Sequence, residues 1–288
     1  MTDAFMIAGG SAVIAATIWE VFSDLFRPAH SGALSDWIGR QLFQLLRRHQ
    51  RFTRLAGPAA IVLVIGAWVL LLVTGFALVY YPLYPGHFRT SIGEVPSHAA
   101  HFATVFYFSF ETLITLGYGE FVPESTISRM LAVSEGLIGF GLLTASVSSI
   151  VLLYPALARM RHLARTVSQL RAAERRTGVS IVSGGGEGLL AALARDVTNT
   201  RIDLLHFPVI YYFATRDREA SLAHWTTALG ELAGEGLEAA APAVRLAAAA
   251  LDSALDDLAE VLADRFVHSP SRARDAIFTA YAAHHHAE

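Results

Sequence analysis

The feature that most constrains this chain is an apolar run from residue 58 to residue 82 that contains no charged residue. About 20 apolar residues in a helix are enough to cross the hydrocarbon core of a bilayer, which is roughly 30 Å thick. Tyr80, Tyr81 and Tyr84 cluster at its far end, where tyrosine rings favour the headgroup level, although they could also simply begin a loop. The run predicts a membrane-spanning helix.

Two more stretches are candidates for spans. Residues 127–154 are apolar except for Arg129 and Glu135, and they contain glycines that allow close packing or bending of a membrane helix: Gly136, Gly139 and Gly141. Residues 4–25 are a weaker candidate, because Glu20 and Asp24 fall in the last two turns. No basic region precedes this N-terminal stretch, so we expect it to be retained rather than cleaved as a secretory signal.

Composition supports a membrane protein and narrows its partners. Hydrophobic residues make up 53% of the chain and mean hydropathy is +0.43. Net charge is only −3 and no region is strongly basic along its length, so nucleic acid is not expected as a partner. Cysteine is absent, which excludes disulfides, thiolate metal sites and a cysteine nucleophile.

Arginine placement predicts the orientation of the spans. Residues 27–54 hold six arginines against one acidic residue, Asp36, and Arg159, Arg161 and Arg165 follow the last span. Both segments are expected to be cytoplasmic, and residues 83–104 to lie outside. Residues 33–54 also place leucines and isoleucine opposite arginines at helical spacing, which indicates an amphipathic helix on the membrane surface. A linker that packs on the C-terminal domain is the alternative.

Residues 158–288 are alanine-rich and repeat apolar residues every three or four positions, so a helical cytoplasmic domain is expected. Breaks are expected at Gly184 to Gly186, Pro208, Gly234 and Pro270. The apolar run from Leu204 to Ala214 is too short to span a bilayer and is expected to be buried core. The terminal histidines, residues 284–286, are expected to form a disordered tail.

Between the two stronger spans lies an aromatic segment, His101 to Thr115, that is too short to cross a membrane. It fits a re-entrant half helix whose negative C-terminal end points at a cation. The next residues, Thr115-Leu116-Gly117-Tyr118-Gly119-Glu120, contain glycines that can adopt backbone angles closed to other residues. Such angles allow successive carbonyl oxygens to face one way and to replace the water shell of a potassium ion.

Residues 58–155 resemble the pore module of the prokaryotic two-helix potassium channels, on the motif YFSFETLITLGYGE of residues 107–120. The resemblance implies a homotetramer in which the carbonyls of the filter, with the Thr115 hydroxyl, bind K⁺. It further implies that the filter is supported by Glu111, Thr112 and Glu120. Gly136 is implied as the gating hinge. The residues implied to line the cavity are Leu137, Phe140, Thr144 and Ser148. In some relatives the carboxylates at the positions of Glu111 and Glu120 share a proton.

Three residues depart from the family pattern: Leu116 stands for the usual valine, Glu120 for aspartate and Ile114 for a frequent threonine. None removes a carbonyl, so they bear on inactivation and filter stability more than on selectivity. Glu135 lies beside the predicted hinge, and a carboxylate inside a membrane is costly and functional by default. It is expected to touch the pore helix from behind, the alternative being that it meets water near the end of its span.

The sequence therefore predicts an all-α membrane protein, a pore-loop potassium channel module with a helical cytoplasmic domain. The expected parts are an N-terminal span (1–27), an interfacial helix (28–56), the pore module (57–157) and the cytoplasmic domain (158–288). We expect no enzymatic activity and no cofactor beyond K⁺ in the filter, with anionic lipids as further partners and a prokaryotic plasma membrane as the location. Alternatives are a non-conducting tetrameric receptor and a potassium uptake subunit, although such subunits usually carry four pore repeats.

Overall fold

The computed structural model describes residues 2–26, 32–47, 55–90, 98–213, 215, 217–267 and 271–285. Within these ranges the chain is helical, apart from short turns and one two-stranded ribbon. Packing divides it into two units. The membrane unit comprises Met1–Arg27, Ser31–Ile38 and Ile61–Ile150, and the second unit comprises Pro28–His30, Gly39–Ala60 and Val151–Glu288.

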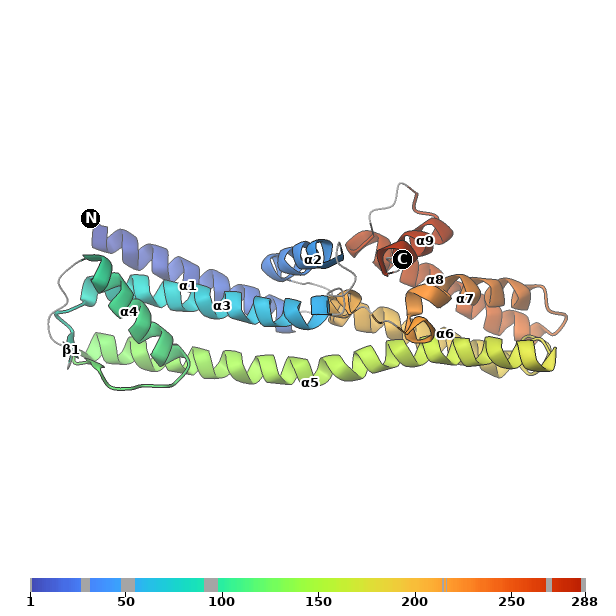
Figure 1. Ribbon diagram of the computed structural model, residues 1–288, viewed down its shortest axis with the longest axis horizontal. Coiled ribbons are helices and arrows are strands. Elements are labelled where there is room, and N and C mark those ends of the chain that lie inside the picture. The colour runs from blue at the N-terminus through green and yellow to red at the C-terminus, as the bar shows by residue number, and fades with distance from the viewer. Residues whose placement is uncertain are drawn as a thin grey trace. The chain divides into compact units, whose positions relative to one another are not determined.

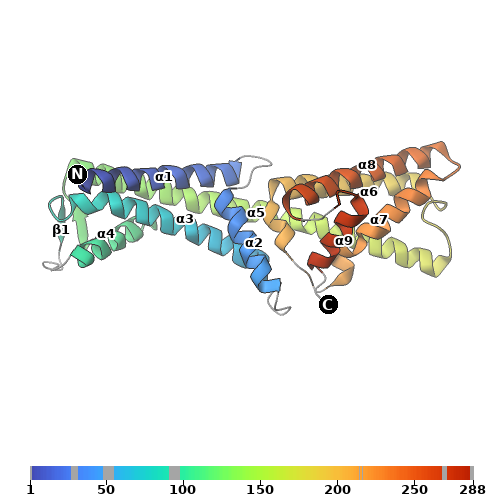
Figure 2. The same ribbon diagram turned by 90° about the horizontal axis from the view of Figure 1, so that it is seen from above.

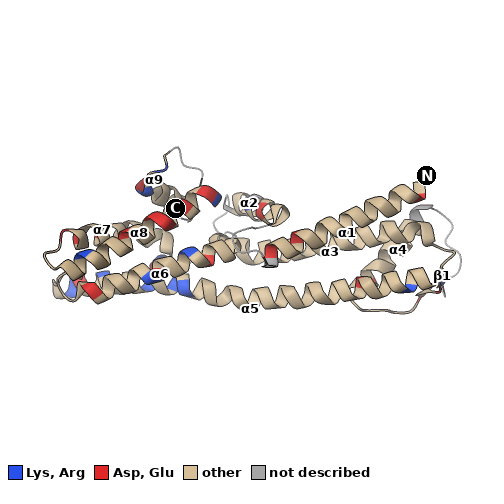
Figure 3. Ribbon diagram, turned by 180° about the vertical axis from the view of Figure 1, so that it is seen from behind, with Lys and Arg blue, Asp and Glu red and all other residues tan. Residues whose placement is uncertain are grey.

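Three helices in the described ranges are long and apolar enough to cross a membrane: α1 (Thr2–Phe26), α3 (Ala56–Tyr80) and α5 (Thr126–Thr177). Helices α1 and α3 run side by side (Figures 1 and 2), and α3 carries no charged residue (Figure 3). The chain is an all-α membrane protein, as the apolar runs predicted. Helix α5 continues well beyond the predicted end of the last span, so the expected boundary at residue 157 falls inside one continuous helix.

Small residues bring α1 and α3 close together. A Cβ atom on Gly10 would lie 2.5 Å from the Gly75 carbonyl oxygen, whereas one on Gly9 would meet nothing within 4 Å. Near the other end of α1, Glu20 Oε1 accepts a hydrogen bond of 2.7 Å from the Leu34 amide, and Asp24 Oδ1 accepts one of 3.0 Å from the Gly32 amide. These two carboxylates therefore cap the start of helix α2 (Ala33–Arg47), where orphan amides favour an anion.

The two halves of α2 have different neighbours. Ile38 belongs to a buried cluster in the membrane unit together with Val64 and Trp68 of α3. Phe43 belongs to the second unit, where its ring packs on Tyr211 and Tyr212 at centroid distances of 6.0 and 5.4 Å. Packing on the C-terminal domain was the alternative that the sequence left open, and contact of α2 with a membrane surface stays a prediction. Of the six arginines between residues 27 and 54, the described backbone includes only Arg40 and Arg47.

Helix α4 (His98–Leu113) forms the pore-helix element. It ends at Leu113, two residues earlier than predicted, because Thr115 already has a left-handed backbone conformation. The short helix η2 (Tyr81–Leu83) and strand β1 (Phe88–Thr90) precede it, and strand β2 (Phe121–Pro123) follows the glycine-rich turn. The strands pair antiparallel. Three-residue strands show too little alternation to be recognised in sequence.

The second unit is helical, as expected. The continuation of α5 is joined by α6 (Gly186–His206), η3 (Pro208–Tyr212), η4 (Arg218–Ala220), α7 (Leu222–Leu237), α8 (Pro242–Arg265) and α9 (Arg274–His285). Ile210, Tyr211 and Tyr212 are buried, which confirms the apolar run around Pro208 as core. The predicted break at Gly234 is wrong, because α7 continues through it and stops only before Pro242. Pro270 lies outside the described residues.

The expectation of a disordered histidine tail is wrong for His284 and His285. Both lie on α9, where His284 Nδ1 is 2.7 Å from the Tyr211 hydroxyl and the His285 ring packs edge-on against Tyr211 at 4.9 Å. Aromatic neighbours that are distant in sequence order this segment, which local composition does not reveal. His286 lies outside the described residues.

Candidate ion pathway

The backbone from Thr115 to Gly119 alternates in the sign of φ. Positive φ angles occur at Thr115 (58°), Gly117 (59°) and Gly119 (79°), and not at the two residues between them. Alternation of right- and left-handed residues turns successive amides to one side of the chain and successive carbonyls to the other. Gly117 and Gly119 adopt these angles at little cost, but Thr115 is a β-branched residue in a region that such residues rarely occupy.

Glu111 holds the amide side of this segment. Its backbone carbonyl accepts a hydrogen bond of 2.7 Å from the Leu116 amide, and its carboxylate Oε2 accepts one of 3.3 Å from the Tyr118 amide. The Thr112 carbonyl accepts one of 3.0 Å from the Thr115 amide. Because these amides are directed at the end of α4, the carbonyls of the alternating segment are directed away from it.

The carbonyl side is open in the single chain. Residues 114–119 are all exposed, with Leu116 at 50% and Tyr118 at 67%, whereas Glu111 and Leu113 at the end of α4 are buried. The single chain therefore leaves this surface uncovered, including the large side chains of Leu116 and Tyr118. After the segment, Phe121 is buried and its strand pairs with β1, which fixes the outer end of the turn.

The two acidic support residues lie in different surroundings. Glu111 is 2% exposed and accepts the Tyr118 amide, whereas Glu120 is half-buried and hydrogen-bonds the Tyr107 hydroxyl. Glu111 thus has a hydrogen-bond partner of its own, and a proton shared between Glu111 and Glu120 stays a prediction.

Helix α5 has a buried face and an exposed face within the membrane unit. Its buried face contains Glu135, Gly139, Leu142 and Ser146, at spacings of three and four residues. The residues expected to line a cavity occupy the opposite, exposed face: Leu137 (70%), Phe140 (62%), Thr144 and Ser148. The hydroxyls of Thr144 and Ser148 bond back to carbonyls of their own helix, each at 2.9 Å. Gly136 lies between the two faces and is half-buried.

Glu135 is fully buried, which confirms the expectation that it lies behind the pore helix. Its Oε2 accepts a hydrogen bond of 2.8 Å from the Tyr80 hydroxyl, and its Oε1 lies 2.5 Å from Ser109 Oγ of α4. Tyr80 and Ser109 are themselves fully buried. The sequence did not indicate these two partners, because they are 55 and 26 residues away from Glu135 and no local pattern pairs them with it.

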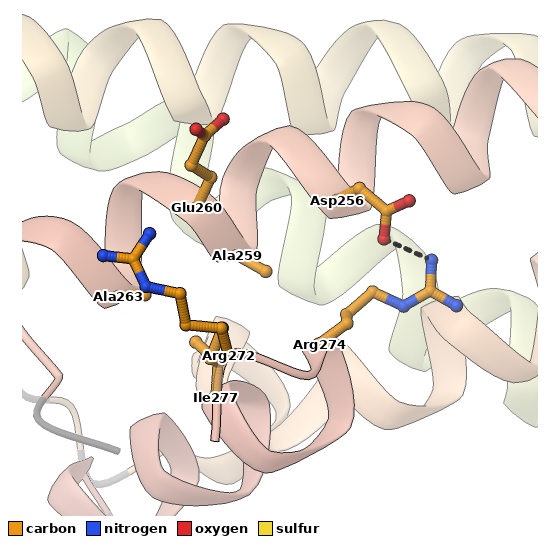
Figure 4. Close-up of a pocket in the computed structure, with 7 residues that line it drawn as sticks. All are labelled: Asp256, Ala259, Glu260, Ala263, Arg272, Arg274 and Ile277. Atoms are coloured by element: carbon orange, nitrogen blue, oxygen red, sulfur yellow. Dashed lines mark hydrogen bonds and ion pairs between the residues drawn. The ribbon is translucent and has the colours of Figure 1, made fainter. Parts of the chain in front are cut away.

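Elsewhere, the second unit has a hollow of about 190 Å³ between α8 and α9 (Figure 4). Its arginines are already paired: Arg274 with Asp252 and Asp256 at 2.5 and 3.0 Å, and Arg272 with Asp264 at 3.2 Å. We assign it no ligand. Among the described residues no group of three or more histidine or acidic side chains could hold a metal ion.

Comparison with known proteins identifies the membrane unit. Residues 67–154 match the ion channel family. This stretch is similar to ion channel domains. It lies within the predicted pore module and contains α4, the alternating segment and the membrane part of α5.

Two relatives show how far the similarity extends. The uncharacterized membrane protein YdjJ of Bacillus subtilis is 23% identical over 235 residues, which cover 77% of this chain and 67% of that protein. Two pore potassium channel c of rice is 34% identical over 82 residues, 28% of this chain and 17% of the rice protein. The chain thus spans about a sixth of the rice channel. No solved structure matches significantly.

Proposed function

We propose that this channel domain conducts K⁺ selectively and passively, as one subunit of a homotetramer. The observation that carries the proposal is the alternating backbone of Thr115 to Gly119, whose amides are held by Glu111 and whose carbonyls are exposed. Four such segments around one axis would form rings of carbonyl oxygens from Thr115, Leu116, Gly117 and Tyr118, joined by the Thr115 hydroxyl. The name of the rice relative supports potassium as the ion.

The remaining expectations fit this proposal. The exposed face of α5 would line a water-filled cavity below the filter. The four inner helices would converge between Ser148 and Pro155 to form a gate, and each helix would bend near Gly136 to open it. The negative end of α4 would stabilise a cation at the membrane centre. The arginines after residue 157 would lie in the cytoplasm beside anionic headgroups of a prokaryotic plasma membrane. K⁺ in the filter would be the only bound cofactor.

A flux measurement tests the proposal. The purified full-length chain in liposomes should take up rubidium at least ten times faster than sodium, and external barium should block the uptake. Mass measurement of the detergent-solubilised protein should give a tetramer. Rubidium uptake no faster than in empty liposomes would refute conduction and favour the non-conducting receptor. Equal rubidium and sodium uptake would refute selectivity alone.

A further inference from the structure

The buried carboxyl group of Glu135 joins three helices of the membrane unit, and the proposed mechanism of conduction does not use it. Tyr80 comes from the end of α3, Ser109 from the turn before the end of α4 and Glu135 from α5. The Ser109 hydroxyl also lies 3.0 Å from the Val73 carbonyl oxygen of α3. Polar groups inside a membrane unit are costly unless they are fully satisfied, so this arrangement requires an explanation.

The number of protons available for hydrogen bonds favours the protonated form of Glu135. A hydroxyl has one proton to donate, and the Val73 carbonyl can only accept. Both contacts of Ser109 are therefore hydrogen bonds only when Glu135 itself donates through Oε1. Donors and acceptors then follow in one direction, from the Tyr80 hydroxyl to Glu135, from Glu135 to Ser109, and from Ser109 to Val73. This form also buries no net charge, whereas an ionised carboxylate would leave one contact unmade.

The surroundings hold the Tyr80 hydroxyl in place. The Tyr80 ring lies edge-on to Phe88 at 5.9 Å and to Phe108 at 5.1 Å, and it stacks on Phe76 at 6.2 Å. A ring confined on several sides presents its hydroxyl in one position. Glu135 thus meets a donor that is already oriented.

One helical turn farther along, α4 and α5 touch again. A Cβ atom on Gly139 would overlap the carbonyl group of Leu113, the last residue of α4, and one on Gly136 would lie 3.8 Å from the Thr112 carbonyl oxygen. Figure 1 shows the end of α4 approaching α5. Residues 112 and 113 lead directly into the alternating segment. Ser109 with Glu135 and Leu113 with Gly139 therefore fix the base of the filter to α5 at two successive turns, on either side of Gly136.

We propose that Glu135, acting as a neutral carboxylic acid, is a positioning residue that holds α5 against the pore helix and so keeps the filter carbonyls in their conducting arrangement. The inference rests on the proposed function. A bend of α5 at Gly136 would have to separate one of the two contacts, and the separation would reach the filter through Leu113. Movement of α5 would therefore change the geometry of the filter through the last turn of α4, between Ser109 and Leu113.

The decisive comparison is between Glu135→Gln and Glu135→Val in the full-length protein. Glutamine can accept from Tyr80 and donate to Ser109, so it reproduces the bonds of the neutral acid, whereas valine leaves the Tyr80 hydroxyl unpaired. The glutamine variant should keep the wild-type ratio of rubidium to sodium uptake within about twofold. The valine variant should lower this ratio about tenfold, the change that loss of one buried hydrogen bond produces. Ser109→Ala should lower the uptake ratio less than Glu135→Val does. The double variant should have nearly the same ratio as Glu135→Val alone, because both changes break the same contact.

A control and a second readout separate positioning from general stability. Ser134→Ala removes a neighbouring exposed hydroxyl that donates to the Leu131 carbonyl of its own helix at 2.8 Å, and it should leave the ratio unchanged. Amide hydrogen exchange followed by mass spectrometry should rise in residues 104–120 of the valine variant and not of the glutamine variant. This readout does not depend on conduction, so it tests the inference even where wild-type liposomes show no flux.

Two outcomes would overturn the inference. A valine variant that assembles with wild-type selectivity and wild-type exchange in residues 104–120 would show that Glu135 does not position the filter. A glutamine variant as impaired as the valine variant in both measurements would show that the neutral acid is not the working form. A wild-type protein without flux would refute the proposed function, and the exchange comparison would then decide on Glu135 alone.

Discussion

At the scale of single residues, the filter depends on backbone angles that few amino acids adopt. Gly117 has a φ of 59°, and an alanine there would be forced into a left-handed conformation that costs roughly 1–2 kcal/mol per residue. Four subunits would multiply this cost. We therefore expect Gly117→Ala to reduce rubidium uptake into liposomes at least about tenfold. Gly66→Ala is the matched control, since its Cβ would meet nothing within 4 Å, and it should conduct normally. Normal rubidium uptake by the Gly117→Ala variant would show that ions do not pass along the filter segment.

Glu111 has one observed role and one expected role, and substitution can separate them. Its carboxylate accepts the Tyr118 amide, and the resemblance adds a proton shared with Glu120. Glu111→Gln keeps an acceptor for that amide, so the rubidium-to-sodium ratio should persist while recovery from inactivation in patch-clamp recordings changes. Glu111→Ala removes the acceptor and should lower the ratio severalfold, as expected for a hydrogen bond worth roughly 1–3 kcal/mol. Glu124→Gln, an exposed acid paired with Arg89, is the control. Unchanged recovery in the glutamine variant would end the shared-proton idea.

The sequence predicted the residues of the filter better than the buried residues that hold the filter in place. Gly117 and Gly119 could be assigned left-handed angles because glycine alone adopts them freely, and the acids at residues 111 and 120 follow a motif. The positive φ of Thr115 could not be anticipated, because a β-branched residue reaches it only when surrounding contacts impose it. Tyr80 and Ser109 were missed for a related reason, since their roles depend on a contact with Glu135 that only the folded chain creates.

At the scale of elements, close approach between α1 and α3 explains why an N-terminal helix with acids in its last turns is part of the membrane unit. Gly9 and Gly10 are neighbours with opposite surroundings. We expect Gly10→Ala to separate the helices and to lower the melting temperature in detergent by several degrees, as a destabilisation of about 1–2 kcal/mol would. Gly9→Ala should leave the melting temperature unchanged or raise it, because alanine favours a helix over glycine. Equal melting temperatures for the two variants would contradict the close packing of α1 against α3 at Gly10.

Hydrophobic periodicity predicted which elements exist but not where they end. The three long apolar helices and the helical second unit follow from patterns that extend over many residues. Helix α5 extends beyond the predicted span because helical spacing continues past residue 157 and Pro155 does not end the helix. Gly234 was given too much weight, since a helix tolerates one glycine for about 1 kcal/mol. The β1–β2 ribbon depends on pairing across the pore helix, which no local signal records.

At the scale of the whole molecule, every contact found for the filter lies inside the membrane unit, so selectivity should not require the second unit. A chain truncated after Arg176 loses α6 to α9 and uncovers buried residues of α5 such as Leu163 and Val167. We expect this chain to form a tetramer whose rubidium-to-sodium ratio stays within about twofold of wild type, while residues 157–176 become sensitive to limited proteolysis. Total rubidium uptake should change, because α6 to α9 no longer cover the continuation of α5. A truncated tetramer that admits sodium as readily as rubidium would show that the second unit shapes the filter and would contradict a pore that is complete within residues 67–154.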